Sequence, residues 1–138
     1  MIGLDTNVFA RYYVDDKADA EAQRQRVAAK RLIESGQPLM VCKTVILELE
    51  WLLRGYYGFA PTEVSSVFRH LLATPHLLVE DRDAVERALS NADTGLDFAD
   101  ALHHASYKSC ASVATFDARK FARRAKKLGL APAVMLPA

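Results

Sequence analysis

The chain of 138 residues contains little of what marks several large classes of protein. Its 2 cysteines, Cys42 and Cys110, lie far apart without metal-type spacing, so we expect small buried thiols in a reducing compartment, not disulfides or a zinc site. No apolar run approaches the roughly 20 residues of a membrane span. The start, Met-Ile-Gly-Leu-Asp, is neither basic nor followed by a long apolar stretch, which predicts a cytoplasmic protein without a secretory signal.

An excess of charge of one sign is also missing. The 18 basic and 17 acidic side chains leave a net charge of +1, so any basic surface for nucleic acid must be local. Glycine is scarce, at 6 residues, and the first predicted strand is followed by Asp5-Thr6-Asn7. A dinucleotide-binding site would need a glycine-rich turn there, so the sequence excludes that class.

Short apolar segments alternate with segments of helical periodicity along the whole chain. The length and the hydrophobic share of 51% predict one domain over residues 1–138. The alternation predicts an α/β fold, a three-layer α/β/α sandwich with a mainly parallel sheet of four to five strands. The predicted strands cover residues 1–4, 39–42, 76–79, 112–115 and 133–136. The predicted helices follow Asp5, cover 18–34, 44–54, 62–73 and 97–108, begin at Asp83, and run from Asp117 to about 129.

Four acidic residues lie where a parallel sheet would gather them at one edge. Asp5 and Asp117 come directly after predicted strands, Asp100 is near the start of the helix before the fourth strand, and Glu48 follows the second strand by about one helical turn. Clustered carboxylates repel and raise each other's pKa, and a hard cation such as Mg²⁺ or Mn²⁺ removes that cost. The pattern therefore predicts metal-assisted chemistry on a phosphate ester.

Capping of helices is the alternative interpretation for three of the acids. Asp5 and Asp117 each precede a predicted helix, and Asp97 opens the helix that holds Asp100 in its first turn. Thr62 is likewise expected to cap a helix, and Asp83 is expected to form a capping box with Glu86 ahead of a loop at 91–95.

Glu48 is different because it lies in the middle of its predicted helix. Counting about 100° per residue places it on a mostly apolar face, whereas Glu50 points away and has Arg54 four residues on. We therefore expect Glu48 to be turned inward and Glu50 to be solvated. An inward carboxylate needs a metal or a charged partner, and Arg11 is the alternative partner.

The helix over 97–108 carries further candidates. Asp97 and Asp100 are three residues apart and lie on one side of the helix, where both could reach one cation. His103 and His104 follow one turn later, but imidazole suits zinc better than magnesium. Packing, or a hydrogen bond to Asp100, is the expected role of these histidines.

These residues also carry a resemblance to a known family. Together they resemble the PIN domain, over essentially the whole chain, and the size is similar to that of a VapC-type toxin of a bacterial toxin–antitoxin pair. The segments that match are Asp5-Thr6-Asn7, Val45-Ile46-Leu47-Glu48-Leu49, Asp97-Phe98-Ala99-Asp100-Ala101-Leu102 and Thr115-Phe116-Asp117 before Phe121. One departure is Lys120, where an acidic residue is frequent in the family.

The resemblance implies a single-domain, Mg²⁺- or Mn²⁺-dependent ribonuclease. It implies Asp5 and Asp100 as the firmest metal ligands, Glu48 and Asp117 as completing the catalytic site, and Asp97 as an extra metal ligand. Other implied features are a homodimer, inhibition by a small cognate antitoxin, and hydrogen bonds that orient the carboxylates from Asn7 and Thr115.

Positive charge for an RNA substrate is concentrated near the C-terminus of the chain. A second basic run is Arg24, Arg26, Lys30 and Arg31, and an ordinary solvated helix face is the alternative interpretation of both runs. The last predicted helix is favoured because it starts beside Asp117. Its basic residues are Arg119, Lys120, Arg123, Arg124, Lys126 and Lys127. The aromatic residues Trp51, Tyr56, Tyr57 and Phe59 could stack on bases, although a role in the core or in a partner-binding groove is the default interpretation.

Two rival functions remain open at this point. The same acids would suit a nuclease that acts on DNA or another nucleic acid. The acidic edge would also suit a phosphate- or RNA-binding module without catalysis. Cleavage of matched RNA and DNA strands separates the first rival, and neutral substitutions of Asp5 and Asp100 separate the second.

Overall fold

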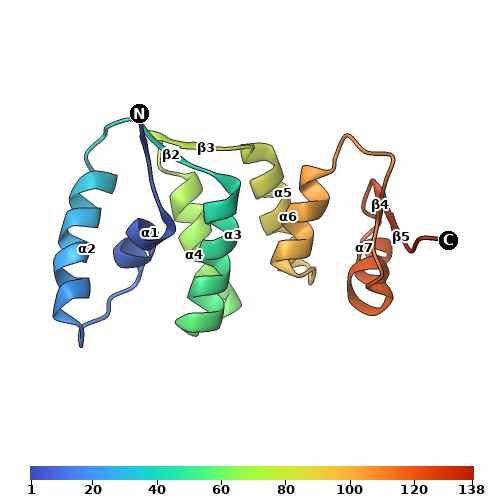
Figure 1. Ribbon diagram of the computed structural model, residues 1–138, viewed down its shortest axis with the longest axis horizontal. Coiled ribbons are helices and arrows are strands. Elements are labelled where there is room, and N and C mark those ends of the chain that lie inside the picture. Colours follow the sequence, from blue (N-terminus) through green and yellow to red (C-terminus); the bar gives the residue numbers. More distant parts are fainter. The chain divides into compact units, whose positions relative to one another are not determined.

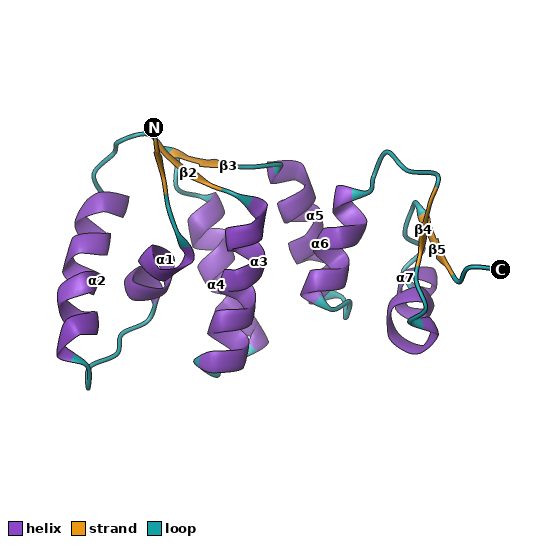
Figure 2. Ribbon diagram, viewed as in Figure 1, coloured by secondary structure: helices purple, strands orange, loops and turns teal.

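The computed structural model describes residues 1–138, and the chain has two compact units, Met1–Glu80 and Asp81–Ala138 (Figure 1). Helices make up most of both units, and the strands are short (Figure 2). No helix is both long and apolar enough to cross a lipid bilayer.

The first unit is built around a parallel sheet in the order β1-β2-β3. Ile2 pairs with Leu39, and Leu39 pairs with Leu77, so β2 is the central strand. Figure 1 shows α1 between α2 and α3, and α1 contacts both of these helices. The elements are β1 (Ile2–Gly3), α1 (Thr6–Tyr13), α2 (Ala20–Ile33), β2 (Leu39–Val41), α3 (Lys43–Trp51), the π-helix η1 (Leu52–Tyr56), α4 (Pro61–Leu72) and β3 (Leu77–Val79).

The core of the first unit includes residues of the central strand and of the helix that follows it. Leu39 and Val41 of β2 are fully buried. The helix that follows buries a stripe at helical spacing, Ile46, Leu49 and Leu53, and the last of these lies in η1. The residues of α3 outside this stripe are at least partly exposed, with the exception of Glu50.

The second unit combines a pair of helices with a two-stranded parallel sheet, β4-β5, in which Val113 pairs with Val134. Its elements are α5 (Arg82–Asp93), α6 (Phe98–Ser106), β4 (Ser112–Ala114), the π-helix η2 (Ala118–Ala122), α7 (Arg123–Lys127) and β5 (Ala133–Met135). Helices α5 and α6 lie side by side (Figure 1) and bury small residues such as Ala84, Ala88 and Ala101. Small side chains let two helices approach closely, which explains the tight pair.

The predicted α/β class with parallel strands is confirmed, and the strands fall within one or two residues of the expected ranges. They form two sheets, one of three strands and one of two. One expectation about the cysteines is wrong: both are free thiols, but Cys110 is exposed and Cys42 only half-buried.

Two predicted helix starts are wrong in detail. Helix α4 begins at Pro61, and the N–H of Ala60 donates to Glu63 Oε1 at 2.9 Å, so Thr62 is not the cap. Proline suits the first helical position because its missing N–H would have no partner there.

Helix α5 begins one residue before Asp83 and continues to Asp93, through part of the expected loop at 91–95. Arg82 Nε donates to Glu86 Oε1 at 2.8 Å, so Glu86 pairs along the helix instead of closing a capping box. Because the helix begins at Arg82, Asp83 lies inside its first turn and not at the N-cap position that a capping box requires.

Candidate functional site

The first pair of predicted acids lies in the first unit, at one open pocket of about 280 Å³. Asp5 reaches it from the start of α1, and Glu48 reaches it from the middle of α3. Asn7, Trp51 and Leu52 also line the pocket. The structure therefore brings Asp5, Asn7 and Glu48 together, although they come from different elements.

Asp5 is placed by the end of the first strand. The N–H of Leu4 donates to the Met40 carbonyl at 2.9 Å, which ends the pairing with β2, and Asp5 Oδ1 then accepts from the N–H of Thr6 at 2.8 Å. The capping interpretation is thus confirmed for Asp5. The cap uses one carboxylate oxygen and leaves Oδ2 for a ligand in the pocket.

Thr6 also lines this pocket, although the sequence indicated it only as part of a helix start. It is 4% exposed, and its buried Oγ1 has no hydrogen-bond partner. A buried hydroxyl without a partner is costly, so its place beside Asp5 singles it out. Threonine is the only residue of the Asp-Thr-Asn motif whose side chain is buried, and this burial depends on packing that the motif itself does not show.

The predicted burial of the two glutamates of α3 is wrong. Glu48 is exposed at the pocket, and Glu50 is only 7% exposed. Arg54 Nε lies 2.8 Å from Glu50 Oε2, so the predicted Glu50–Arg54 pair exists but is partly buried. The proposed alternative partner of Glu48, Arg11, instead donates from Nε to Gln25 Oε1 at 2.7 Å.

The error has a physical reason. Helix α3 is apolar on more than one side, so counting apolar neighbours does not identify the side that faces the core. The buried stripe of Ile46, Leu49 and Leu53 carries Glu50 at its margin and leaves Glu48 outside. Glu48 is a site candidate because it shares a pocket with Asp5, not because it is desolvated.

The other three acids lie in the second unit. Asp97 Oδ1 accepts from the N–H of Asp100 at 3.1 Å, and Asp117 Oδ1 accepts from the N–H of Lys120 at 3.0 Å, so both acids cap helices as the alternative interpretation held. Thr115 was expected to bind a carboxylate. Its Oγ1 accepts from the backbone N–H of Asp117 at 3.0 Å and so fixes the segment that carries Asp117, while a hydrogen bond from Thr115 to a carboxylate stays a prediction.

Asp100 shows that these three acids influence one another. Partial burial, and then the negative charges of Asp97 and Asp117, raise the pKa of Asp100 above its ordinary value, while His103 and Arg124 act in the opposite direction. The carboxylates of the second unit are therefore close enough to repel. A divalent cation would relieve this repulsion, and the oxygen donors fit Mg²⁺ or Mn²⁺.

The two histidines of α6 have different surroundings. His103 is exposed, whereas His104 is 2% exposed and donates from Nε2 to the Pro132 carbonyl at 2.8 Å. The His104 ring also meets Phe121 edge-on. Packing is confirmed as the role of His104, but its hydrogen bond ties α6 to the segment before β5 and does not reach Asp100.

The basic residues of the last helical segment are all exposed. Arg119 and Lys120 lie in η2, Arg123 and Arg124 begin α7, and Arg124 is near enough to Asp100 to act on its pKa. No group of three or more His, Cys, Asp or Glu side chains is gathered as the ligands of one metal ion. The acids fall instead into a pair, Asp5 and Glu48, and a trio, Asp97, Asp100 and Asp117.

Comparison with known protein families identifies the class. The PIN domain family matches residues 2–127, a span that includes all five acids, and the chain belongs to this family. PIN domains are generally metal-dependent nucleases, so the chain has a nuclease-type fold. A search of curated proteins finds no match.

Proposed function

We propose that the chain is a Mg²⁺- or Mn²⁺-dependent endoribonuclease that hydrolyses RNA phosphodiesters, and the toxin component of a VapBC-type toxin–antitoxin pair. The observation that carries the proposal is the pocket of the first unit. There two carboxylates, Asp5 and Glu48, line one open space beside the unpartnered buried hydroxyl of Thr6. Membership of a nuclease family supports the reaction class.

The residues present fit a divalent metal. Carboxylate and hydroxyl oxygens are the donors that Mg²⁺ and Mn²⁺ prefer, and repulsion within the trio would fall once a cation is bound. The cation would supply a Lewis acid and a lowered pKa for attacking water. The proposed ligands are Asp5, Asp100, Glu48, Asp97 and Asp117.

The chain's own contribution is to hold these carboxylates in place. Backbone N–H groups fix one oxygen each of Asp5, Asp97 and Asp117. A fixed oxygen orients the whole carboxylate, so the second oxygen is presented without further loss of side-chain freedom. The caps and the proposed metal site are therefore compatible uses of the same residues.

Two groups of residues would hold the RNA. The exposed cations Arg119, Lys120, Arg123 and Arg124 would bind phosphates. Trp51 lines the pocket of Asp5 and is 55% exposed, so its ring can stack on a base. A Cβ at Gly55 would lie 3.2 Å from Trp51 Cε2, which shows how closely the indole lies along its own helix.

The test is cleavage of matched RNA and DNA strands by the purified chain with Mg²⁺, Mn²⁺ or EDTA. Asp5→Asn and Asp100→Asn should each reduce metal-dependent RNA cleavage by about a thousandfold while the fold survives, because a lost ligand removes several kcal/mol of charge stabilisation. Asp16→Asn, a loop substitution outside the proposed site, is the matched control.

Each other result points to a rival. Preferential cleavage of DNA would favour a nuclease for other nucleic acid. Undiminished cleavage by both variants would refute the catalytic assignment, and binding without cleavage in the parent would favour a non-catalytic RNA-binding module. The proposed partners are a small cognate antitoxin and a second copy of the chain in a cytoplasmic homodimer. Growth arrest on expression, relieved by a small protein encoded beside the chain, would support the toxin role.

A further inference from the structure

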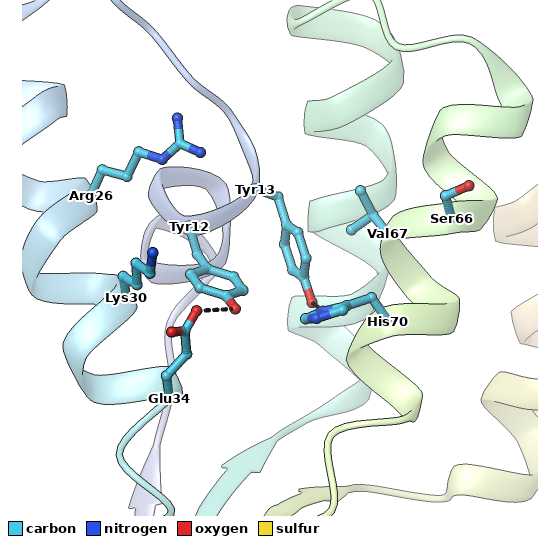
Figure 3. Close-up of a pocket in the computed structure, with 8 residues that line it drawn as sticks. All are labelled: Tyr12, Tyr13, Arg26, Lys30, Glu34, Ser66, Val67 and His70. Atoms are coloured by element: carbon cyan, nitrogen blue, oxygen red, sulfur yellow. Dashed lines mark hydrogen bonds between the residues drawn. The ribbon is translucent and has the colours of Figure 1, made fainter.

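A second cavity lies in the first unit, away from the acidic pocket. Its volume is about 420 Å³, and it opens between α1, α2 and α4 (Figure 3). It shares no lining residue with the pocket of Asp5 and Glu48. Asp5 caps the start of α1, whereas Tyr12 and Tyr13 come from the last turn, about 12 Å further along the helix.

Aromatic rings form one side of this cavity. The rings of Tyr12 and Tyr13 are 4.9 Å apart and edge-to-face, and the His70 ring lies 5.6 Å from that of Tyr13. Both hydroxyls are engaged, since Tyr12 donates to Glu34 Oε2 and Tyr13 meets His70 Nδ1, each at 2.8 Å (Figure 3). The rings are therefore held in position before any ligand arrives.

The tyrosine rings remain neutral over the physiological range. Burial, the hydrogen bond to Glu34 and the charge of Glu34 raise the pKa of Tyr12 to about 12. A phenol ring held in this way offers a stacking surface for a flat ligand.

The polar groups of the cavity are of two kinds. Lys30 lines the cavity without an ion-pair partner, whereas Arg26 is held by Asp15 at 2.7 Å. Glu34 uses Oε2 for Tyr12, so its Oε1 can accept from another donor. One unpaired cation and one unused acceptor thus accompany the aromatic rings.

We propose that this cavity binds a nucleoside monophosphate unit whose base carries an exocyclic amino group. The base stacks on Tyr12, the amino group donates to Glu34 Oε1, and the phosphate binds Lys30. Each contact is a common mode of nucleotide recognition. The volume lies in the range of small-ligand sites, roughly 300–1,000 Å³.

A peptide side chain is the poorer occupant. An apolar side chain would cover the rings but leave Lys30 and Glu34 without partners at the edge of a desolvated contact, which is unfavourable. The nucleotide belongs either to a free mononucleotide or to an RNA strand. Only in the second case does the inference rest on the proposed function.

The test is titration calorimetry of the full chain in EDTA with AMP, CMP, GMP and UMP separately. AMP, CMP and GMP should bind, and UMP, which has no amino group, should bind about tenfold more weakly. Lys30→Met and Tyr12→Leu should each weaken binding by roughly tenfold or more. Arg31→Met is the matched control, because Arg31 is exposed on the same helix and does not line the cavity.

Tyr12→Phe keeps the ring and loses only the hydroxyl, so it should retain more binding than Tyr12→Leu and guards against a folding defect. Failure of AMP, CMP and GMP to bind at millimolar concentration overturns the proposal, as does equal weakening by Lys30→Met and Arg31→Met. Equal binding of UMP contradicts the role given to Glu34. Chemical shifts at Tyr12 and His70 caused by an acidic peptide but not by nucleotides would assign the cavity to a protein partner.

A second arm separates the two sources of the nucleotide. A short RNA is titrated in EDTA into the parent, Lys30→Met and Arg31→Met proteins. If Lys30→Met alone weakens RNA binding, the occupant is a nucleotide of the strand, and if RNA binding is unchanged while AMP binding falls, it is a free mononucleotide. Cleavage is measured in neither arm, so this inference and the nuclease proposal fail independently.

Discussion

At the scale of single residues, Asp100 is the carboxyl group on which burial and neighbouring negative charge act together. Its carboxyl group is half-buried, and Asp97 and Asp117 add negative charge around it, all of which raises the pKa of Asp100. Between the ordinary value near 3.8 and this raised value, the folded protein holds the proton more tightly than the unfolded chain does. The free energy of unfolding therefore falls as the pH rises through that window.

In EDTA, Asp100→Asn should abolish this decrease in the free energy of unfolding with rising pH. At about pH 7 the variant should have a higher free energy of unfolding than the parent, and at about pH 3, where the carboxyl is protonated in both states, the difference should disappear. Urea denaturation at the two pH values measures this. Saturating Mg²⁺ should reverse the order, because it stabilises only a protein that binds it.

Asp16→Asn is the control for this measurement, since it changes the same functional group outside the trio. An Asp100→Asn protein that is less stable than the parent at neutral pH in EDTA would show that Asp100 is not under repulsion. A stability difference that persists at low pH would assign the effect to packing or hydrogen bonding instead of charge.

Single residues also show how far the sequence could be interpreted. Asp5, Asp97 and Asp117 were identified both as caps and as site residues, and the structure shows the caps. A cap depends on residues within three positions, which the sequence displays directly. The unpartnered hydroxyl of Thr6 could not be predicted, because burial of that atom depends on the packing of α1 against other elements.

At the scale of elements, α3 shows that the spacing of apolar residues does not always identify the buried side of a helix. It buries Leu49 and Glu50 and leaves Glu48 and Trp51 exposed, although the helix has apolar residues on several sides. The buried side of α3 is set by its packing against other elements, α1 among them, and the sequence of one helix does not contain that information. The Glu50–Arg54 pair was predictable because its spacing is local.

The two glutamates of α3 form a matched pair of variants. Glu48→Gln should abolish most RNA cleavage and leave the free energy of unfolding nearly unchanged, because Glu48 is exposed in the pocket. Glu50→Gln should keep cleavage in the folded protein but lower the free energy of unfolding by about 1 kcal/mol, because it weakens a charge-assisted hydrogen bond at a buried position. Urea denaturation and RNA cleavage are measured on both proteins.

The reverse pattern would be decisive against this account. Loss of stability in Glu48→Gln with normal cleavage would mean that Glu48 is a structural residue. Loss of cleavage in a fully stable Glu50→Gln protein would move the catalytic role to Glu50, and the pocket of Asp5 would lose its second acid.

Two helical elements could not be predicted from a hydrophobic pattern with a period of 3.6 residues. The two π-helices, η1 and η2, each contain a widened turn that periodicity cannot register. The first, η1, continues the helix of Glu48 after Trp51, and the second, η2, begins directly after Asp117. Strand positions were predicted better, because short apolar runs bounded by polar residues mark them directly.

At the scale of the whole molecule, the family match covers both compact units, from residue 2 to residue 127. The parallel strands and alternating helices expected from the sequence are present. The five proposed ligands are shared between the units, two in the first and three in the second. The nuclease proposal therefore requires that carboxylates of both units bind Mg²⁺ or Mn²⁺.

Paramagnetic broadening by Mn²⁺ tests that claim most directly. In amide NMR spectra of the full chain, Thr6 reports on Asp5 and Ala101 reports on Asp100. The account predicts that Mn²⁺ broadens both signals, that Asp5→Asn abolishes the broadening of Thr6, and that Asp100→Asn abolishes the broadening of Ala101. Signals of Thr6 and Ala101 that stay sharp at saturating Mn²⁺, or that broaden in the variants as in the parent, would contradict the proposed metal ligands.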